Sequence, residues 1–194
     1  MASPARVRKS PSNQVRIIGG QWRSRIVRFP DAPGLRPTPD RVRETLFNWL
    51  GQRLDGLECE DHFAGSGALG FEALSRGASR AVMVESGREA VAALRLSAQA
   101  LGAGGAVVVA GEALAWLKRD EGCFDLAFVD PPYASALLEP VLLALQARMK
   151  PGGRAYCESA GPVTAGGPWR VLKEGRAGAV HFALLAFEPG SETE

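Results

Sequence analysis

The sequence predicts an α/β fold: a doubly wound, mostly parallel sheet of seven strands that ends in an antiparallel hairpin. Two observations predict this sheet. Between Gly56 and residue 158, short apolar segments alternate with longer segments of helical periodicity, as in parallel strands joined by right-handed helical crossovers. Near the end, two apolar segments are separated only by Gly175–Gly178, a spacing typical of a hairpin.

Three parts of the chain are expected from its 194 residues, a length that suits one domain with an extension. Residues 1–14 have no apolar period and are expected to form a disordered basic tail. Residues 15–36 are expected to form an N-terminal β-hairpin extension. Residues 37–194 are expected to form the domain that contains the sheet.

The extension is predicted from two short strands around a glycine pair. Val15–Ile18 is expected to be the first strand, Gly19-Gly20 the turn, and Trp22–Phe29 the second strand. Because side chains alternate along a strand, Arg23 and Arg25 are expected to share one face. Trp22 would lie beside the turn, where its ring could stack on an unpaired base.

The remaining elements follow from periodicity. Further strands are expected at Leu57–His62, Arg80–Glu85, Ala106–Ala110, Phe124–Asp130, Arg154–Glu158, Trp169–Glu174 and Ala179–Phe187. Helices are expected at 38–53, Ala68–Arg76, Arg88–Leu101, Ala113–Arg119 and Ala136–Met149, the last ended by Pro151-Gly152-Gly153. Thr38 is the predicted N-cap of the first helix, with Pro39 at the first helical position and Asp40 in the first turn.

Basic and acidic residues are distributed unevenly along the chain. Residues 1–43 hold ten of the 23 basic residues but only two acidic ones, and the rest of the chain is net acidic. A basic arm on an acidic body indicates a polyanionic partner. No apolar run reaches the length of a membrane span, and the start has no secretory apolar region. Three scattered cysteines favour neither disulfides nor a zinc site, and so predict a reducing cytoplasm and no metal.

The stretch from Asp61 to Gly70 is predicted to bind a small molecule. Its Gly-x-Gly-x-x-Gly pattern suits a tight turn into a helix, whose N-terminus attracts polar or anionic groups. A dinucleotide and S-adenosylmethionine both fit this pattern. Asp61 favours S-adenosylmethionine, because its carboxylate would repel a pyrophosphate but attract an ammonium group. The terminal hairpin agrees, since it is typical of class I methyltransferases, whereas a dinucleotide fold would continue in parallel.

Four acids follow four strands and are expected at the carboxyl edge of the sheet. Asp61 would meet the cofactor ammonium, Glu85 the ribose hydroxyls and Glu112 the adenine, while Asp130 would face the acceptor as well. The residues expected to bind the cofactor are Thr38, Asp61, Ala64, Gly65, Ser66, Gly67, Glu85, Glu112, Ala113 and Asp130.

The run Asp130-Pro131-Pro132-Tyr133 is predicted to be the catalytic corner. The lone pair of an exocyclic base amine is delocalised into the ring, so the amine is a poor nucleophile. A carboxylate and a fixed backbone carbonyl that accept its N–H bonds would aim that lone pair at an electrophilic methyl group. Pro132 restricts Pro131, and Tyr133 offers a ring for a flipped base to stack on.

Together these motifs resemble the RsmD-type bacterial 16S ribosomal RNA guanine-N2 methyltransferases. The resemblance rests on residues 61–70, 72–78 and 130–133, and on the front-end stretches 16–25 (Arg-Ile-Ile-Gly-Gly-Gln-Trp-Arg-Ser-Arg) and 35–50. It extends over about residues 15–188. The Asp-Pro-Pro-Tyr motif alone would suit adenine N6, guanine N2 or a protein glutamine as the methyl acceptor. The N-terminal stretches 16–25 and 35–50 favour guanine N2 among these acceptors.

The resemblance implies that the protein transfers a methyl group from S-adenosylmethionine to N2 of guanine 966 in 16S rRNA, within a small ribosomal subunit or an assembly intermediate. Thr38 would then help to hold the methionine end. The residues expected to bind RNA are Arg16, Trp22, Arg23, Arg25, Arg36 and Arg41. The chain departs from the family at His62, where an apolar residue or cysteine is usual, and at Glu112, where Asn or Asp is usual.

Other functions remain open at this point. An adenine-N6 methyltransferase acting on RNA or DNA shares the catalytic motif. An NAD-dependent oxidoreductase would use the glycine pattern, and a non-catalytic RNA-binding factor could retain the fold.

Overall fold

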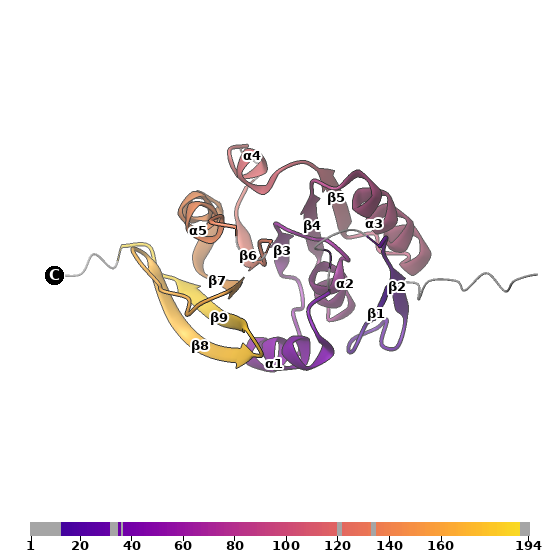
Figure 1. Ribbon diagram of the computed structural model, residues 1–194, viewed down its shortest axis with the longest axis horizontal. Coiled ribbons are helices and arrows are strands. Elements are labelled where there is room, and N and C mark those ends of the chain that lie inside the picture. The colour runs from indigo at the N-terminus through magenta and orange to yellow at the C-terminus, as the bar shows by residue number, and fades with distance from the viewer. Residues whose placement is uncertain (1–12, 32–34, 36, 120–121, 133–134, 191–194) are drawn as a thin grey trace, which may run out of the picture.

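The computed structural model describes residues 13–31, 35, 37–119, 122–132 and 135–190. They form a seven-stranded sheet with helices on both faces and a separate two-stranded sheet near the N-terminus (Figure 1). The strand order of the large sheet is β5-β4-β3-β6-β7-β9-β8. Its strands are β3 (Glu58–Asp61), β4 (Arg80–Glu85), β5 (Ala106–Ala110), β6 (Phe124–Val129), β7 (Met149–Ser159), β8 (Trp169–Ala177) and β9 (Val180–Phe187).

The predicted sheet is confirmed. Neighbours among β3 to β7 pair in parallel, whereas β9 pairs antiparallel with both β7 and β8. Residues 178–179 connect β8 to β9, and this turn is shorter than predicted because β8 continues to Ala177, three residues beyond its predicted end. The strand order reverses beside β3, so the carboxyl edge of β3 and β6 is where an open α/β sheet holds its ligand.

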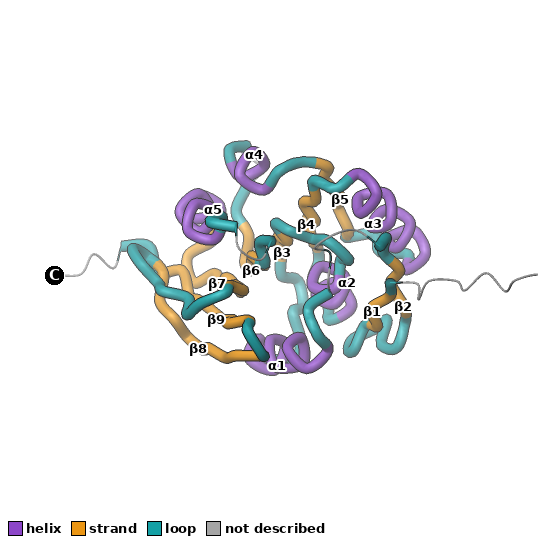
Figure 2. The backbone as a smooth tube through the Cα atoms, in the orientation of Figure 1, coloured by secondary structure: helices purple, strands orange, loops and turns teal. Residues whose placement is uncertain are grey.

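Helices pack on the two faces of the sheet in two groups. The helices are α1 (Asp40–Leu50), α2 (Ala68–Ser75), α3 (Arg88–Leu101), α4 (Ala113–Leu117) and α5 (Leu138–Leu145), followed by the 3-10 turn Gln146–Arg148. Figure 2 shows these helices beside the strands of the sheet. One apolar cluster contains buried residues of α1, α2 and α3, and a second contains buried residues of α4 and α5. A third, smaller cluster joins Trp116 of α4 to Val82, Val84 and Phe124 of the sheet.

Some predicted boundaries are wrong. Pro39, not Thr38, is the N-cap of α1, and the helix ends at Leu50 because Gly51 adopts a φ of 95°. Pro151–Gly153 lies inside β7 rather than after a long helix. The pairing of β6 with β7 shifts register between Phe124 and Leu126, which accommodates this irregular segment.

The N-terminal extension differs more. Its strands β1 (Gln14–Arg16) and β2 (Ile26–Arg28) are three residues each, and residues 17–25 form a long connection between them. Arg23 therefore lies in a turn and Arg25 precedes β2, so the prediction that they share a strand face is wrong. Arg36 and most of the predicted tail, residues 1–12, lie outside the described residues.

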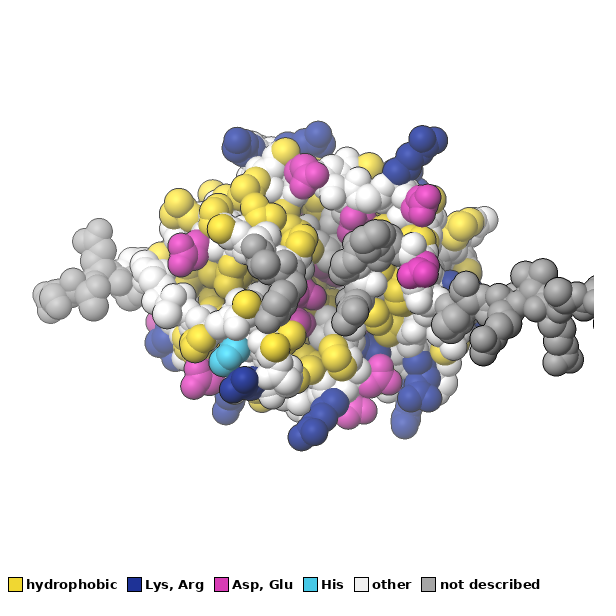
Figure 3. Space-filling view, in the orientation of Figure 1, with side chains coloured by type: hydrophobic (Ala, Val, Ile, Leu, Met, Phe, Trp, Pro, Cys, Tyr) yellow, Lys and Arg dark blue, Asp and Glu magenta, His cyan; other side chains and the backbone are white. Residues whose placement is uncertain are grey.

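Within the described part of the chain, no helix has both the length and the apolar character needed to cross a membrane. Figure 3 shows one face of the molecule, with Lys and Arg side chains around its periphery and Asp and Glu side chains spread across it.

Candidate cofactor and acceptor site

The glycine turn between β3 and α2 has the geometry that its sequence predicts. Gly65 and Gly67 have φ values of 49° and 78°, a region that L side chains rarely adopt. A Cβ on Gly67 would also approach the Phe71 ring to 2.5 Å, whereas a Cβ on Gly65 would meet no atom closer than 3.8 Å. Gly67 is thus required by conformation and packing, while the space beside Gly65 is open to a ligand.

Glu85 fixes this turn from the end of β4. Its Oε2 accepts the backbone N–H of Gly65 at 2.8 Å, and its Oε1 accepts that of Gly87 at 2.6 Å. Ala64 donates its backbone N–H to the carbonyl of Val84, which like Glu85 belongs to β4, at 3.0 Å. The turn is therefore held against β4, with the Glu85 carboxylate at its mouth.

Asp61, the last residue of β3, is only 3% exposed. Burial raises the pKa of Asp61 to about 7, and the Glu85 carboxylate adds to the rise. Hydrogen bonds from the backbone N–H groups of Phe63 and Gly70 oppose it. The carboxylate form of Asp61 is thus poorly compensated in the free protein, and a cationic partner would favour it.

Asp61 belongs to a row of three acids on neighbouring strands. It pairs in register with Phe128 of β6, and Val129 pairs with Cys157 of β7. Asp130 follows β6 and Glu158 is the next-to-last residue of β7, so these registers place all three acids on the same face of the sheet. Sequence reasoning missed Glu158 as a site residue, because the register of β6 with β7 cannot be read from the sequence.

The acids influence one another. Burial raises the pKa of Asp130 well above its usual range, and the nearby Glu158 and Asp61 carboxyls raise it further. Burial also raises the pKa of Glu158, against hydrogen bonds from Tyr156 and Thr38 that lower it. This edge of the sheet therefore concentrates negative charge that burial and repulsion disfavour, as is common at functional sites.

The predicted catalytic corner is described only in part. Asp130 and Pro131 are half-buried, Pro132 is exposed, and the Pro132 carbonyl accepts the Ser135 N–H at 2.9 Å. Tyr133 lies outside the described residues. The corner follows β6, next to β3 and the glycine turn, as predicted.

The remaining predicted cofactor residues surround this edge. Thr38 is buried and contacts Glu158, and Ser66 is buried with its Oγ 3.3 Å from the Ala68 nitrogen. Glu112 is exposed at the N-cap of α4, next to the buried Ala113. Among the described residues, no cluster of His, Cys, Asp and Glu side chains could hold a metal ion.

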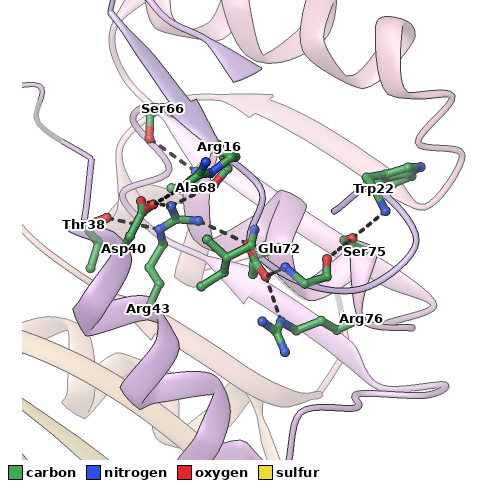
Figure 4. Close-up of polar contacts among 12 residues, drawn as sticks. Arg16, Trp22, Thr38, Asp40, Arg43, Ser66, Ala68, Glu72, Ser75 and Arg76 are labelled. Atoms are coloured by element: carbon green, nitrogen blue, oxygen red, sulfur yellow. Dashed lines mark hydrogen bonds and ion pairs between the residues drawn. The ribbon is translucent and has the colours of Figure 1, made fainter. Parts of the chain in front are cut away.

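A buried ionic network attaches the N-terminal extension to α2 (Figure 4). Glu72 accepts the backbone N–H groups of Ile18 and Gly19 at 2.9 and 2.8 Å, and pairs with Arg43 at 3.1 Å and Arg76 at 2.8 Å. The Arg43 guanidinium also donates to the Arg16 carbonyl at 2.8 Å. The extension is thus bound to the helix that follows the glycine turn.

The predicted stacking role of Trp22 is wrong in this structure. The residue is 9% exposed, lies in the apolar cluster beneath α2, and donates its backbone N–H to Ser75 Oγ at 2.9 Å. The segment from 17 to 25 docks on α2 instead of extending a free hairpin. Its apolar side chains therefore turn inward.

The predicted RNA-binding arginines divide between two edges of the sheet. Arg16 and Arg41 are exposed near the start of α1, where Arg16 lies 3.5 Å from Asp40. Arg25 instead donates to the Ala100 carbonyl, near the end of α3, at 2.7 Å. Arg23 lines a cavity of about 880 Å³ beside the ends of α1 and α2. Because these helices run from the carboxyl edge to the amino edge, Arg23 and Arg25 lie away from Asp130.

His62 packs on the opposite face from Asp61. Its Nε2 lies 3.3 Å from Glu60 Oε2, and burial together with Arg148 lowers the pKa of His62 to about 3. The imidazole is therefore neutral at physiological pH. A buried, neutral imidazole suits a packing role rather than proton transfer.

Comparisons with known proteins agree with this geometry. Residues 15–186 match the family described as Conserved hypothetical protein 95. Ribosomal RNA small subunit methyltransferase D of Escherichia coli K12 is 43% identical over 190 residues, which cover 95% of this chain and 96% of the relative. The Haemophilus influenzae protein of the same name is 40% identical over 179 residues, which cover 88% and 93% of the two chains.

Solved structures of similar proteins have the same fold. The yhhF protein of Escherichia coli superposes with a TM-score of 0.82 at 43% identity, covering 91% of this chain and 99% of that one. Precorrin-6y C5,15-methyltransferase of Geobacter metallireducens, at 18% identity and a TM-score of 0.63 over 82% and 94% of the chains, shares the fold alone. The predicted class I methyltransferase fold is thereby confirmed. The chain belongs to the family that includes ribosomal RNA small subunit methyltransferase D.

Proposed function

We propose that this protein transfers a methyl group from S-adenosylmethionine to the exocyclic N2 of guanine 966 in 16S ribosomal RNA. The observation that carries this proposal is the juxtaposition of two features on adjacent strands: the glycine turn with Asp61 after β3, and Asp130 with Pro131-Pro132 after β6. The named relatives support the RNA substrate. Because the buried Cys59 and Cys157 are unpaired thiols, we place the activity in the cytoplasm.

The residues present fit S-adenosylmethionine. Among the described residues, the buried Asp61 carboxyl has no cationic partner, which suits the ammonium group, and the open space beside Gly65 leaves room for the cofactor. Glu85, at the mouth of the turn, would accept the ribose hydroxyls. Glu112 and Ala113 would border the adenine, and Thr38 and Ser66 the methionine end. The cofactor supplies an electrophilic sulfonium methyl group.

Asp130 and the Pro131 carbonyl would orient the acceptor. Each accepts one N–H of the exocyclic amine, which directs the nitrogen lone pair toward the methyl group. Pro132 restricts the backbone at Pro131, and so holds that carbonyl in place. Tyr133 would stack on the flipped base. The raised pKa of Asp130 suits this role, since N–H donors would favour its ionised form once the base is bound.

RNA would approach across the N-terminal extension. Arg16 and Arg41 are exposed near the start of α1, which the Thr38–Glu158 contact places beside the acceptor corner, and they would contact the nearest phosphates. Arg23 and Arg25 would reach only RNA that continues to the opposite edge of the sheet. Arg36 remains part of the proposed surface. A buried Trp22 would instead support the extension from beneath.

The test is methyl transfer from labelled S-adenosylmethionine to unmethylated 16S rRNA, offered both as naked RNA and within small subunits or assembly intermediates. We expect label in N2-methylguanine at guanine 966, identified by nucleoside analysis. Label in N6-methyladenine would replace this proposal with an adenine methyltransferase, and RNA binding without turnover would indicate a non-catalytic factor. Calorimetry with S-adenosylmethionine and with NAD provides a separate test of the cofactor.

A further inference from the structure

Glu158 lies on the side of the site where the acceptor base must enter. The strand order places the cofactor turn over β3 and β4, with β6 and then β7 on the other side. A base held by Asp130 at the end of β6 therefore lies toward β7. Glu158, one residue beyond the Val129–Cys157 pair, is the acid that β7 contributes there.

The Glu158 carboxylate is buried and held in one orientation. It is 7% exposed, its Oε1 accepts the Tyr156 hydroxyl at 2.8 Å, and the Thr38 side chain hydrogen-bonds it. It is also close enough to Asp130 to disfavour the ionised form of that acid. The molecule thus keeps a second carboxylate beside the catalytic one, although burial and repulsion disfavour the arrangement.

We propose that Glu158 accepts the N1–H of the target guanine and thereby selects guanine over adenine. This inference rests on the proposed function, and it adds a specificity-determining residue to the same site. Asp130 would hold the N2 amine, and Glu158 the neighbouring donor on the same edge of the base.

The chemistry of the two purines explains the choice. Guanine presents adjacent N1–H and N2–H₂ donors on its Watson–Crick edge, and an ionised carboxylate offers only acceptors, so two carboxylates complement it. Adenine presents a lone pair at N1, which would face the Glu158 carboxylate without a proton between them. A buried acceptor left unpaired in this way costs far more than a lost contact with water, so the discrimination can be large.

The test compares two RNA substrates with wild-type protein and variants. The target guanine is replaced by 2-aminopurine, which retains the 2-amino group but lacks N1–H. With wild-type protein we expect kcat/KM to fall roughly 100-fold on the 2-aminopurine RNA. With Glu158→Gln, whose amide can donate to a ring nitrogen, we expect the difference between the two RNAs to shrink to about tenfold or less.

Tyr156→Phe is the matched control. It removes a hydrogen bond to Glu158 but leaves the carboxylate, so the guanine preference should persist within about threefold. A preference that weakens equally in both variants would show that Glu158 acts only through packing, and would overturn the inference.

The wild-type arm keeps the inference falsifiable even if Glu158→Gln fails to fold. Equal methylation of both RNAs by wild-type protein would overturn the specificity role while leaving the proposed function intact. Absence of N2-methylguanine from the unmodified RNA would overturn both. Melting temperature and cofactor affinity of each variant, measured beside wild type, identify a variant whose defect is in folding.

Discussion

Asp61 is expected to make the cofactor-free protein less stable as the pH rises. Burial raises its pKa from 3.8 to about 7 in the native state, whereas the unfolded chain exposes it to water. Between these two values the native state therefore binds a proton that the unfolded state has released. Since stability falls with pH wherever the native state holds more protons, Asp61 contributes a loss of stability that is complete above about pH 7.

The size of this effect follows from the shift. Each pKa unit corresponds to about 1.4 kcal/mol, so from about pH 5 to about pH 8 Asp61 lowers the free energy of unfolding by about 2–3 kcal/mol. Asp61→Asn removes this dependence. The variant also loses one of two hydrogen bonds from the backbone N–H groups of Phe63 and Gly70, since one amide oxygen replaces two carboxylate oxygens. That loss is independent of pH, so the slope is the informative quantity.

The assay is urea unfolding of wild-type protein and Asp61→Asn at several pH values, without cofactor. Buried groups that do not interact with Asp61 are common to both proteins, so their effects cancel in the difference. They include His62, whose lowered pKa makes stability rise with pH between about 3 and 6.5. We expect wild type to lose stability relative to the variant as the pH increases. A difference that stays constant, or that moves in favour of wild type, would refute the account of Asp61 as a poorly compensated acid.

Three further predictions follow from the site and its support. Asp130→Asn should lower methyl transfer by about 1,000-fold in single-turnover assays, with cofactor affinity by calorimetry nearly unchanged; parallel loss of both would contradict a role toward the acceptor. Glu72→Gln should lower the free energy of unfolding by about 3 kcal/mol, because it leaves the buried Arg76 guanidinium without a carboxylate and Arg43 with Asp40 alone. Arg53→Ala breaks an exposed ion pair with Asp55 and should change the free energy of unfolding by less than about 0.5 kcal/mol. If Glu72→Gln and Arg53→Ala had equal effects in urea unfolding, burial would not be the cause. Arg16→Ala should weaken RNA binding and reduce the salt slope by about one. Arg170→Ala, at the opposite edge of the sheet, should leave both unchanged; identical slopes for the two variants would remove Arg16 from the RNA surface.

Local patterns predicted the elements whose sequence and environment agree. The bounds of β4, β5 and α3 match the sequence prediction. The strand β5 is an apolar run, β4 is an apolar run between Arg80 and Glu85, and α3 is capped by Gly102 in a left-handed conformation. The glycine turn could also be predicted from the sequence, since few residues other than glycine adopt its φ values. In these segments, short-range chemistry and tertiary structure favour the same result.

The extension and Glu158 could not be predicted because long-range contacts decide both. The sequence predicts residues 17–25 to be the turn and the adjoining strand ends of a hairpin, yet Glu72 and Ser75 of α2 supply partners for their backbone N–H groups. Tertiary packing therefore overrides the strand alternation and buries Trp22. Glu158 reads as an ordinary strand end until the register with β6 places it beside Asp130.

The helix α2 contacts both the glycine turn and the N-terminal extension. Its N-terminus emerges from the glycine turn at Gly67, and Glu72, near its other end, holds the N-terminal extension through Ile18 and Gly19. Eight helical residues span only about 12 Å, so the turn and the extension are attached to one short rigid element. The ion pairs of Glu72 with Arg43 and Arg76 are buried, and breaking one costs several kcal/mol. RNA that displaces the extension must therefore either break the hydrogen bonds of Ile18 and Gly19 to Glu72 or move α2, and with it the turn proposed to hold the methyl donor.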